Sequence, residues 1–126
     1  MKIVFGFFLL ALITFSCKSK SAGPTGQEMY KNIDVSGAKQ YIMNSPNLVI
    51  LDVRTPGETK DGMIPNAIEI DYKNSNFETE INKLDKSKSY LVYCRSGGRS
   101  VSACEIMSAA GFTDLTNMQG GYSAWK

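Results

Sequence analysis

The feature that most constrains the fold is the stretch from Ser89 to Gly111, SYLVYCRSGGRSVSACEIMSAAG. Residues 90–93 are aromatic, aliphatic and β-branched, which is typical of a strand buried on both faces. Apolar side chains then recur at spacings of three and four from Val101 to Ala110, which predicts an amphipathic helix that ends at Gly111. The stretch therefore predicts a strand, a tight loop and a helix in that order.

The predicted loop combines a cysteine with two glycines and two arginines, in the order Cys94, Arg95, Ser96, Gly97, Gly98 and Arg99. Glycines permit backbone angles that other residues resist, so successive N–H groups can turn inward and form a nest that binds anions. This nest, the N-terminus of the helix and both arginines would lower the pKa of Cys94. A pKa two units below the ordinary ~8.5 would make roughly three quarters of the thiol reactive at neutral pH. We therefore interpret Cys94 as a nucleophile, with a buried structural cysteine as the alternative.

Composition narrows the chemistry that this cysteine could perform. The chain has no histidine, which excludes Ser-His-Asp and Cys-His catalysis. Its three cysteines do not match metal-ligand spacing, so we expect no metal site. The 14 basic and 12 acidic residues form no long run of either sign, which argues against a nucleic-acid surface. The cysteine must therefore be activated by backbone amides and arginines.

The N-terminus predicts export and lipidation. Lys2 is followed by the apolar run IVFGFFLLALI, and the arrangement of residues up to Cys17 is that of a secretory signal peptide. The apolar run is too short to span a membrane as a stable anchor. The sequence ITFSC resembles a bacterial lipobox, in which the cysteine is lipidated, although Thr14 stands where leucine is usual. We predict a lipoprotein signal peptide over 1–16, a flexible tether over 17–29 and a lipid on Cys17. An ordinary signal peptide cut nearby and an uncleaved anchor are the alternatives.

These N-terminal features also predict a location. A lipid on Cys17 would hold the domain at a membrane of the bacterial cell envelope, and we expect the domain on the periplasmic side. The tether is small and polar, so it would separate the membrane from the folded part.

Strand and helix patterns alternate along residues 30–126, which we predict to form one domain. Short apolar runs predict five strands, at 33–35, 48–53, 67–70, 90–93 and 114–118. Helical patterns lie between and after them, at 38–42 with Ser36 as N-cap, at 56–62, at 77–84, at 99–110 and at the C-terminal end. This alternation predicts an α/β fold with a parallel, about five-stranded sheet and helices on both faces. Cys94 would lie at the carboxyl end of a strand, where such sheets place reactive sites.

Four motifs resemble a known family, the single-domain rhodaneses, which are thiosulfate and persulfide sulfurtransferases. They are LDVRTPGE at 51–58, IPNAI at 64–68, the loop from Cys94 to Ser100, and Gly111-Phe112 with Gly120-Gly121 and Trp125. The resemblance covers roughly residues 30–125 and implies the rhodanese-like fold. The chain departs from the family at Met63 and Asn66, where Gly-His-Ile-Pro-Gly is common, and near Thr59, where an aromatic residue is usual.

The resemblance implies a sulfurtransferase that moves sulfane sulfur from thiosulfate or a persulfide donor to cyanide or a thiol. No metal or organic cofactor is implied. By resemblance, Cys94 forms the persulfide, the amides of residues 95–99 hold the transferred sulfur, and Arg95 and Arg99 attract an anionic donor. Asp52 and Arg54 look like buried support beneath the loop, with direct contact to the substrate as an equal alternative.

Two other classes of function stay open. Cell-division phosphatases and arsenate reductases share this fold and place a cysteine and an arginine around an oxyanion. Their loop is one residue longer than the four-residue interval between Cys94 and Arg99. A non-catalytic rhodanese-like binding module is the third class, and the presence of Cys94 argues against it.

The other cysteine of the predicted helix, Cys104, lies ten residues after Cys94. Ten helical residues span about 15 Å, which exceeds the distance that a disulfide tolerates. We therefore interpret Cys104 as a core residue, with a resolving role in catalysis as the alternative.

Overall fold

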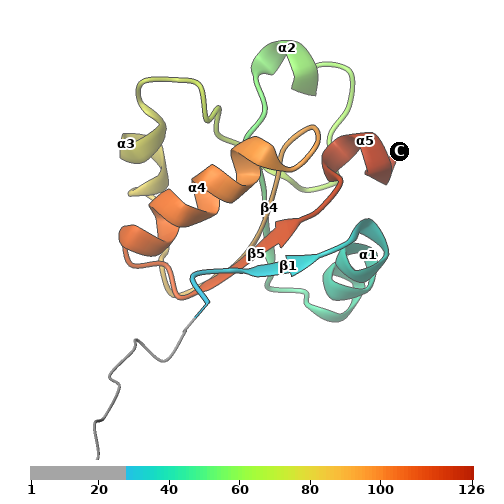
Figure 1. Ribbon diagram of the computed structural model, residues 1–126, viewed down its shortest axis with the longest axis horizontal. Coiled ribbons are helices and arrows are strands. Elements are labelled where there is room, and N and C mark those ends of the chain that lie inside the picture. Colours follow the sequence, from blue (N-terminus) through green and yellow to red (C-terminus); the bar gives the residue numbers. More distant parts are fainter. Residues whose placement is uncertain (1–27) are drawn as a thin grey trace, which may run out of the picture.

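Strands and helices alternate throughout the part of the chain that the computed structural model describes, residues 28–126 (Figure 1). They follow one another as β1 (Lys31–Ile33), α1 (Val35–Asn44), β2 (Val49–Asp52), α2 (Pro56–Thr59), β3 (Ile68–Glu69), α3 (Phe77–Ile81), β4 (Ser89–Tyr93), α4 (Gly98–Ala109), β5 (Asp114–Met118) and α5 (Gly121–Trp125). The predicted signal peptide, Cys17 and nearly all of the predicted tether lie outside the described residues. Within residues 28–126, no helix has the length and apolar character needed to cross a membrane.

The five strands form one parallel sheet in the order β1-β5-β4-β2-β3. The central strand is β4, where Leu91 pairs with Ile50 on one side and with Thr116 on the other. This topology confirms the predicted five-stranded α/β fold. It places the carboxyl end of β4, and with it Cys94, at the middle of one edge of the sheet.

Apolar side chains cover both faces of the sheet, which explains why β2 and β4 are continuous apolar runs in the sequence. Alternate residues of β4 point to opposite faces: Val92 packs in one core cluster with α3 and α4, and Leu91 packs in the other with α1 and α5. Figure 1 shows α3 and α4 side by side on one face and α1 on the other. Both clusters pack against β4, so the strand that leads to Cys94 is fixed from both faces of the sheet.

The start of α1 differs from the sequence prediction. The first strand ends at Ile33, and the N-cap is Asp34, so Ser36 lies inside the helix and the predicted cap was wrong. The carboxylate of Asp34 accepts a hydrogen bond of 2.7 Å from the N–H of Gly37. A carboxylate satisfies a free N–H group and also meets the positive end of the helix dipole, which explains why the helix begins earlier.

One departure from the rhodanese motif has a structural explanation. Asn66 stands where the family commonly has glycine, and its φ is 66°. Asparagine adopts this left-handed conformation more readily than other residues with a side chain. The turn before β3 therefore keeps its shape without the glycine.

Candidate active site

Cys94 directly follows the central strand β4, and the loop after it leads into α4. Figure 1 shows this loop in orange at the top of the sheet. Gly97 has a φ of 117°, a left-handed conformation in which a side chain would be strained. The backbone can therefore turn sharply enough to direct N–H groups at the cysteine sulfur.

Hydrogen bonds surround the sulfur of Cys94, which is only 1% exposed. The N–H of Gly97 donates to Sγ at 3.0 Å, and the hydroxyl of Ser100 lies 3.4 Å from Sγ. Burial acts to raise the pKa of Cys94, but hydrogen bonds from the hydroxyl and amide of Ser100 and the amides of Gly97 and Ser96 outweigh it. The pKa of Cys94 is therefore lowered, which favours the nucleophilic thiolate.

Ser100 is a site residue to which the sequence analysis assigned no role. Its side chain is fully buried in the first turn of α4, and its hydroxyl lies 3.1 Å from the carbonyl oxygen of Gly97. The hydroxyl has a single proton, so it can donate either to this carbonyl or to a Cys94 thiolate. The only signal in the sequence was a serine six residues after the cysteine, at the start of the predicted helix.

The C-terminal turn holds the other side of the loop. The N–H of Tyr122 donates to the carbonyl of Cys94 at 2.8 Å, and the N–H of Ser123 donates to the carbonyl of Arg95 at 3.0 Å. Gly121 has a φ of 59°, and a Cβ atom there would lie 2.5 Å from the carbonyl oxygen of Arg95. Only glycine fits this contact, which explains the second glycine of the Gly120-Gly121 motif.

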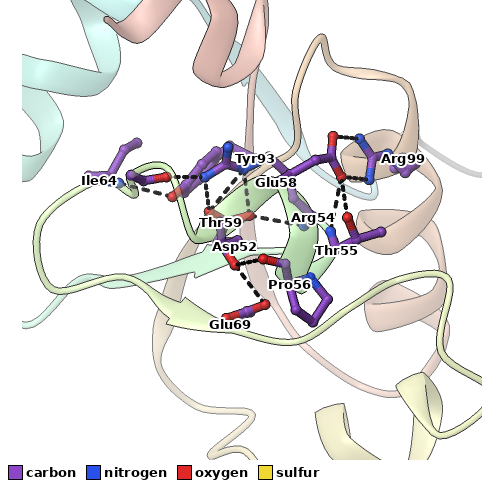
Figure 2. Close-up of polar contacts among 11 residues, drawn as sticks. Asp52, Arg54, Thr55, Pro56, Glu58, Thr59, Ile64, Glu69, Tyr93 and Arg99 are labelled. Atoms are coloured by element: carbon purple, nitrogen blue, oxygen red, sulfur yellow. Dashed lines mark hydrogen bonds and ion pairs between the residues drawn. The ribbon is translucent and has the colours of Figure 1, made fainter.

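Arg99, which was predicted to attract an anionic donor, binds an acidic side chain of α2 in the structure. Its guanidinium donates to both carboxylate oxygens of Glu58, with Nη1 2.8 Å from Oε2 and Nη2 2.7 Å from Oε1 (Figure 2). Oε2 of Glu58 also accepts hydrogen bonds from the N–H and the hydroxyl of Thr55. The hydrogen bond from Arg99, against some opposition from burial, holds the pKa of Glu58 well below its usual range. The role of Arg99 toward a donor stays a prediction.

Arg95 is exposed and, within residues 28–126, takes part in no ion pair. Its side chain lies on a cleft of about 270 Å³ beside the loop. The cleft is lined by Arg54, Gly57, Glu58, Asp61, Arg95, Tyr122, Ser123 and Lys126. Cys94 is not part of this lining because its sulfur is buried among the loop amides.

The two predicted support residues form a buried ion pair. Nη2 of Arg54 lies 2.7 Å from Oδ2 of Asp52, and it also donates to the carbonyl oxygen of Gly62 at 2.7 Å. The guanidinium lies over the ring of Tyr122 at 4.1 Å from its centre. Asp52 is fully buried, whereas Arg54 contributes to the cleft lining. The pair therefore connects β2 with both the 59–62 turn and the C-terminal turn that holds the reactive loop.

Cys104 is a free thiol at the middle of α4, fully buried in the same core cluster as Cys94. Burial raises the pKa of this thiol to about 12. The interpretation of Cys104 as a core residue is confirmed. Over residues 28–126, no group of three or more acidic, cysteine or histidine side chains is placed to hold a metal ion.

Comparisons with known proteins agree with this architecture. The family model of the rhodanese-like domain matches residues 34–126. A sulfurtransferase of Allochromatium vinosum is 31% identical over 97 residues, which cover 77% of this chain and 89% of that protein. The chloroplastic thiosulfate sulfurtransferase 16 of Arabidopsis thaliana is 39% identical over 85 residues, covering 60% of this chain and 71% of that protein. A rhodanese-like domain protein from Staphylococcus aureus has a crystal structure with a TM-score of 0.69 and 34% identity, covering 76% of this chain and 91% of that chain.

Proposed function

The chain belongs to the rhodanese-like domain family, and on that premise we propose that it is a sulfurtransferase in which Cys94 carries the transferred sulfur as a persulfide. The environment of the Cys94 sulfur supports this most directly. Burial alone would suppress the thiolate, yet the loop amides and Ser100 lower the pKa of Cys94. Such a thiol is an activated nucleophile without any histidine.

The proposed reaction has two halves. The Cys94 thiolate attacks the outer sulfur of thiosulfate, the sulfur–sulfur bond of the donor breaks, and sulfite leaves with the electron pair. The new terminal sulfur of the persulfide carries negative charge, which we propose the loop amides stabilise; the contact of the Gly97 N–H with the Cys94 sulfur supports this role. A cyanide ion or a thiolate then attacks this terminal sulfur, forms thiocyanate or a new persulfide, and releases the Cys94 thiolate.

We propose thiosulfate or a low-molecular-weight persulfide as the donor. The thiosulfate sulfurtransferase of Arabidopsis thaliana at 39% identity supports the first of these. The exposed guanidinium of Arg95 at the cleft supports an anionic donor, since it can attract the oxygens that remain after the outer sulfur has been taken.

Mass spectrometry of the protein after treatment with thiosulfate tests the proposal directly. We expect one added sulfur, located on the peptide that contains Cys94 and removed by cyanide. The Cys104→Ala variant should gain the same sulfur, and the Cys94→Ser variant should gain none. Thiocyanate formation by a Cys94→Ser protein would contradict the mechanism.

Hydrolysis of phosphate esters is the alternative activity on the same fold, and an assay with an aryl phosphate tests it. A bound phosphate needs donors about 2.9 Å from each of three oxygens, and the four-residue interval between Cys94 and Arg99 leaves little room beside the thiolate. The guanidinium of Arg99 also donates to both carboxylate oxygens of Glu58, so these N–H groups are already used and cannot at the same time bind an oxyanion. We expect negligible hydrolysis of an aryl phosphate, and one glycine inserted between Gly97 and Gly98 should lower sulfur transfer. Efficient aryl phosphate hydrolysis without persulfide formation would replace our proposal.

We further propose that a lipid on Cys17 anchors the domain to a membrane of the bacterial envelope, with the domain on the periplasmic side. The resemblance of ITFSC to a lipobox supports this location. Incorporation of labelled fatty acid into the full-length protein is the measurement, with Cys17→Ala as the variant and Cys104→Ala as the matched control. Equal labelling of wild type and Cys17→Ala would rule the anchor out.

A further inference from the structure

The contact between Glu58 and Arg99 is unusual among the ion pairs of residues 28–126 because it joins two elements beside the reactive loop. Its two parallel hydrogen bonds are 2.7 and 2.8 Å long, and the two side chains are only 24% and 20% exposed. Thr55 fixes the carboxylate further through its N–H and hydroxyl. Glu58 is therefore a preorganised partner for Arg99, and the pair is expected to persist in solution.

This contact changes the charge that a substrate meets. Arg99 lies in the first turn of α4, directly before Ser100, whose hydroxyl is 3.4 Å from the sulfur of Cys94, so a charge at Arg99 is near the reacting sulfur. Hydrogen bonds to Glu58 raise the pKa of Arg99, and the negative charge of Cys94 raises it further. With Glu58 in place, the two charges largely cancel. Arg95 and Lys126 are the positive groups of the cleft without an acidic partner among residues 28–126, and Asp61 also contributes to the cleft lining.

We infer that Glu58 is a specificity-determining residue, which holds the charge of Arg99 in an ion pair and so disfavours dianionic sulfur donors relative to donors of lower charge. The inference rests on the proposed function, since it concerns the choice of donor for the same cysteine. The preferred donors are then sulfane-sulfur compounds with one negative charge or none beside the reacting sulfur. Thiosulfate itself, with two charges, is then a poorer donor than the reactive loop alone would make it.

Two donors with the same reacting bond isolate this effect. Thiosulfate carries two negative charges, and methanethiosulfonate replaces one of its oxygens by a methyl group and carries one. In both cases the Cys94 thiolate takes the outer sulfur and the sulfur–sulfur bond breaks. The leaving groups are sulfite from thiosulfate and methanesulfinate from methanethiosulfonate. The ratio of kcat/KM for thiosulfate to kcat/KM for methanethiosulfonate therefore measures how the site treats one additional charge.

The decisive variant is Glu58→Gln, whose amide oxygen can still accept from Thr55 while the negative charge is lost. We expect the thiosulfate to methanethiosulfonate ratio to rise about three- to tenfold, which one partly screened charge at close range produces. The rise should shrink at high salt. The matched control is Glu80→Gln, which removes a carboxylate from an exposed ion pair with Lys83 far along the chain and should leave the ratio unchanged within about twofold.

A double variant, Glu58→Gln with Arg99→Gln, separates this role from an anchoring one. Its net charge equals that of the wild type, so the ratio should stay within about twofold of the wild-type value even though absolute rates change. If Arg99 instead binds the donor while Glu58 merely orients it, both the single and the double variant will show a lower ratio. Should Glu58→Gln fail to fold by circular dichroism, the double variant decides.

The outcomes also distinguish this inference from the proposed function. A wild-type protein that forms no persulfide with either donor would refute the sulfurtransferase mechanism. A wild-type protein that accepts sulfur from both donors, together with an unchanged or lower ratio in Glu58→Gln, would refute the role of Glu58 alone.

Discussion

Cys94 and Cys104 differ in the acidity of their thiols although both are buried in the same core cluster. The pKa of Cys94 is lowered, whereas burial raises the pKa of Cys104 to about 12. Burial opposes ionisation of both thiols. The difference comes from hydrogen bonds: the sulfur of Cys94 accepts from the N–H of Gly97 and lies beside the hydroxyl of Ser100, while Cys104 is surrounded by apolar side chains.

Backbone conformation explains this contrast. Cys104 lies within α4, where the N–H groups are used by the hydrogen bonds of the helix itself. Cys94 precedes that helix, where the first N–H groups have no helical partner and Gly97 turns the chain so that they meet the sulfur. A thiol therefore becomes reactive in this fold through free N–H groups at the start of a helix, whereas burial in the core lowers its reactivity.

The largest expected effect comes from replacing each of the two cysteines separately. Cys94→Ser should reduce thiocyanate formation from thiosulfate to the rate without enzyme, because serine is nearly isosteric but far less nucleophilic toward sulfur. Cys104→Ala should keep most of the wild-type turnover. Circular dichroism establishes that both variants are folded. Loss of turnover in a folded Cys104→Ala protein would restore a resolving role for Cys104.

Alkylation compares the two thiols in the same molecule. A pKa of about 12 against one below 9.0 makes the thiolate fraction at pH 8 at least several hundredfold smaller at Cys104. Iodoacetamide should therefore modify Cys94 long before Cys104, as followed by peptide mass spectrometry. The Cys94 rate should rise with pH and reach its plateau at a lower pH than an ordinary cysteine does, because the pKa of Cys94 is lowered. Equal rates at both positions in the folded protein would contradict the difference in acidity between the two thiols.

Removing one hydrogen-bond donor to the sulfur should raise the pKa of Cys94, and so make this thiol more like Cys104. Ser100→Ala deletes the hydroxyl 3.4 Å from the sulfur, and a hydrogen bond to a charged group is worth about one pKa unit or somewhat more. We expect roughly tenfold slower alkylation at neutral pH, with the rate recovering at high pH. Ser102→Ala, also in α4, is the matched control. A lower rate at every pH without a shifted midpoint would assign Ser100 a purely structural role.

Replacing Cys104 should affect the stability of the fold more than its activity. Cys104→Ala leaves a small void beneath α4 and should lower the free energy of unfolding by about 1 kcal/mol in chemical denaturation. Turnover per folded molecule should be unchanged. A neutral effect on stability would mean that the surrounding side chains close the void.

The smallest expected effect concerns acid and the Glu58–Arg99 pair. In the unfolded chain Glu58 takes up a proton near its ordinary pKa of 4.5, whereas in the folded protein the pKa is well below that value. The unfolded state therefore binds more protons as the pH falls, and the stabilising contribution, about 1 kcal/mol, is complete above about pH 5 and declines below it. Denaturation of wild type and Glu58→Gln between pH 3 and 7 should show the difference between them narrowing toward low pH. A constant difference would contradict the shifted pKa.

Much of the reactive unit could be predicted because it is local in the sequence. The buried strand, the glycine loop and the amphipathic helix follow one another within 89–111, and their periodicity and composition indicate each of them. The same reasoning attributed the activation of Cys94 partly to two arginines. In the structure, hydrogen bonds from Ser100, Gly97 and Ser96 outweigh burial and lower the pKa of Cys94, and one of those arginines binds Glu58.

The partners of the loop could not be predicted because they come from distant parts of the chain. Glu58 and Arg99 are 41 positions apart, and nothing in a charge pattern distinguishes this pair from other acidic and basic residues of the chain. The same holds for Gly121, whose lack of a side chain matters only because the carbonyl of Arg95 lies against it. Such contacts depend on the assembled sheet rather than on local preference.

The position of the last turn has a consequence for the order in which the site is completed during folding. The turn after β5 supplies the N–H groups that bind the carbonyls of Cys94 and Arg95, and β5 itself pairs with β1 at the other end of the described chain. Contacts between segments so distant in sequence form late in folding. The reactive loop should therefore become rigid only in one of the last steps, when the first and last strands have come together.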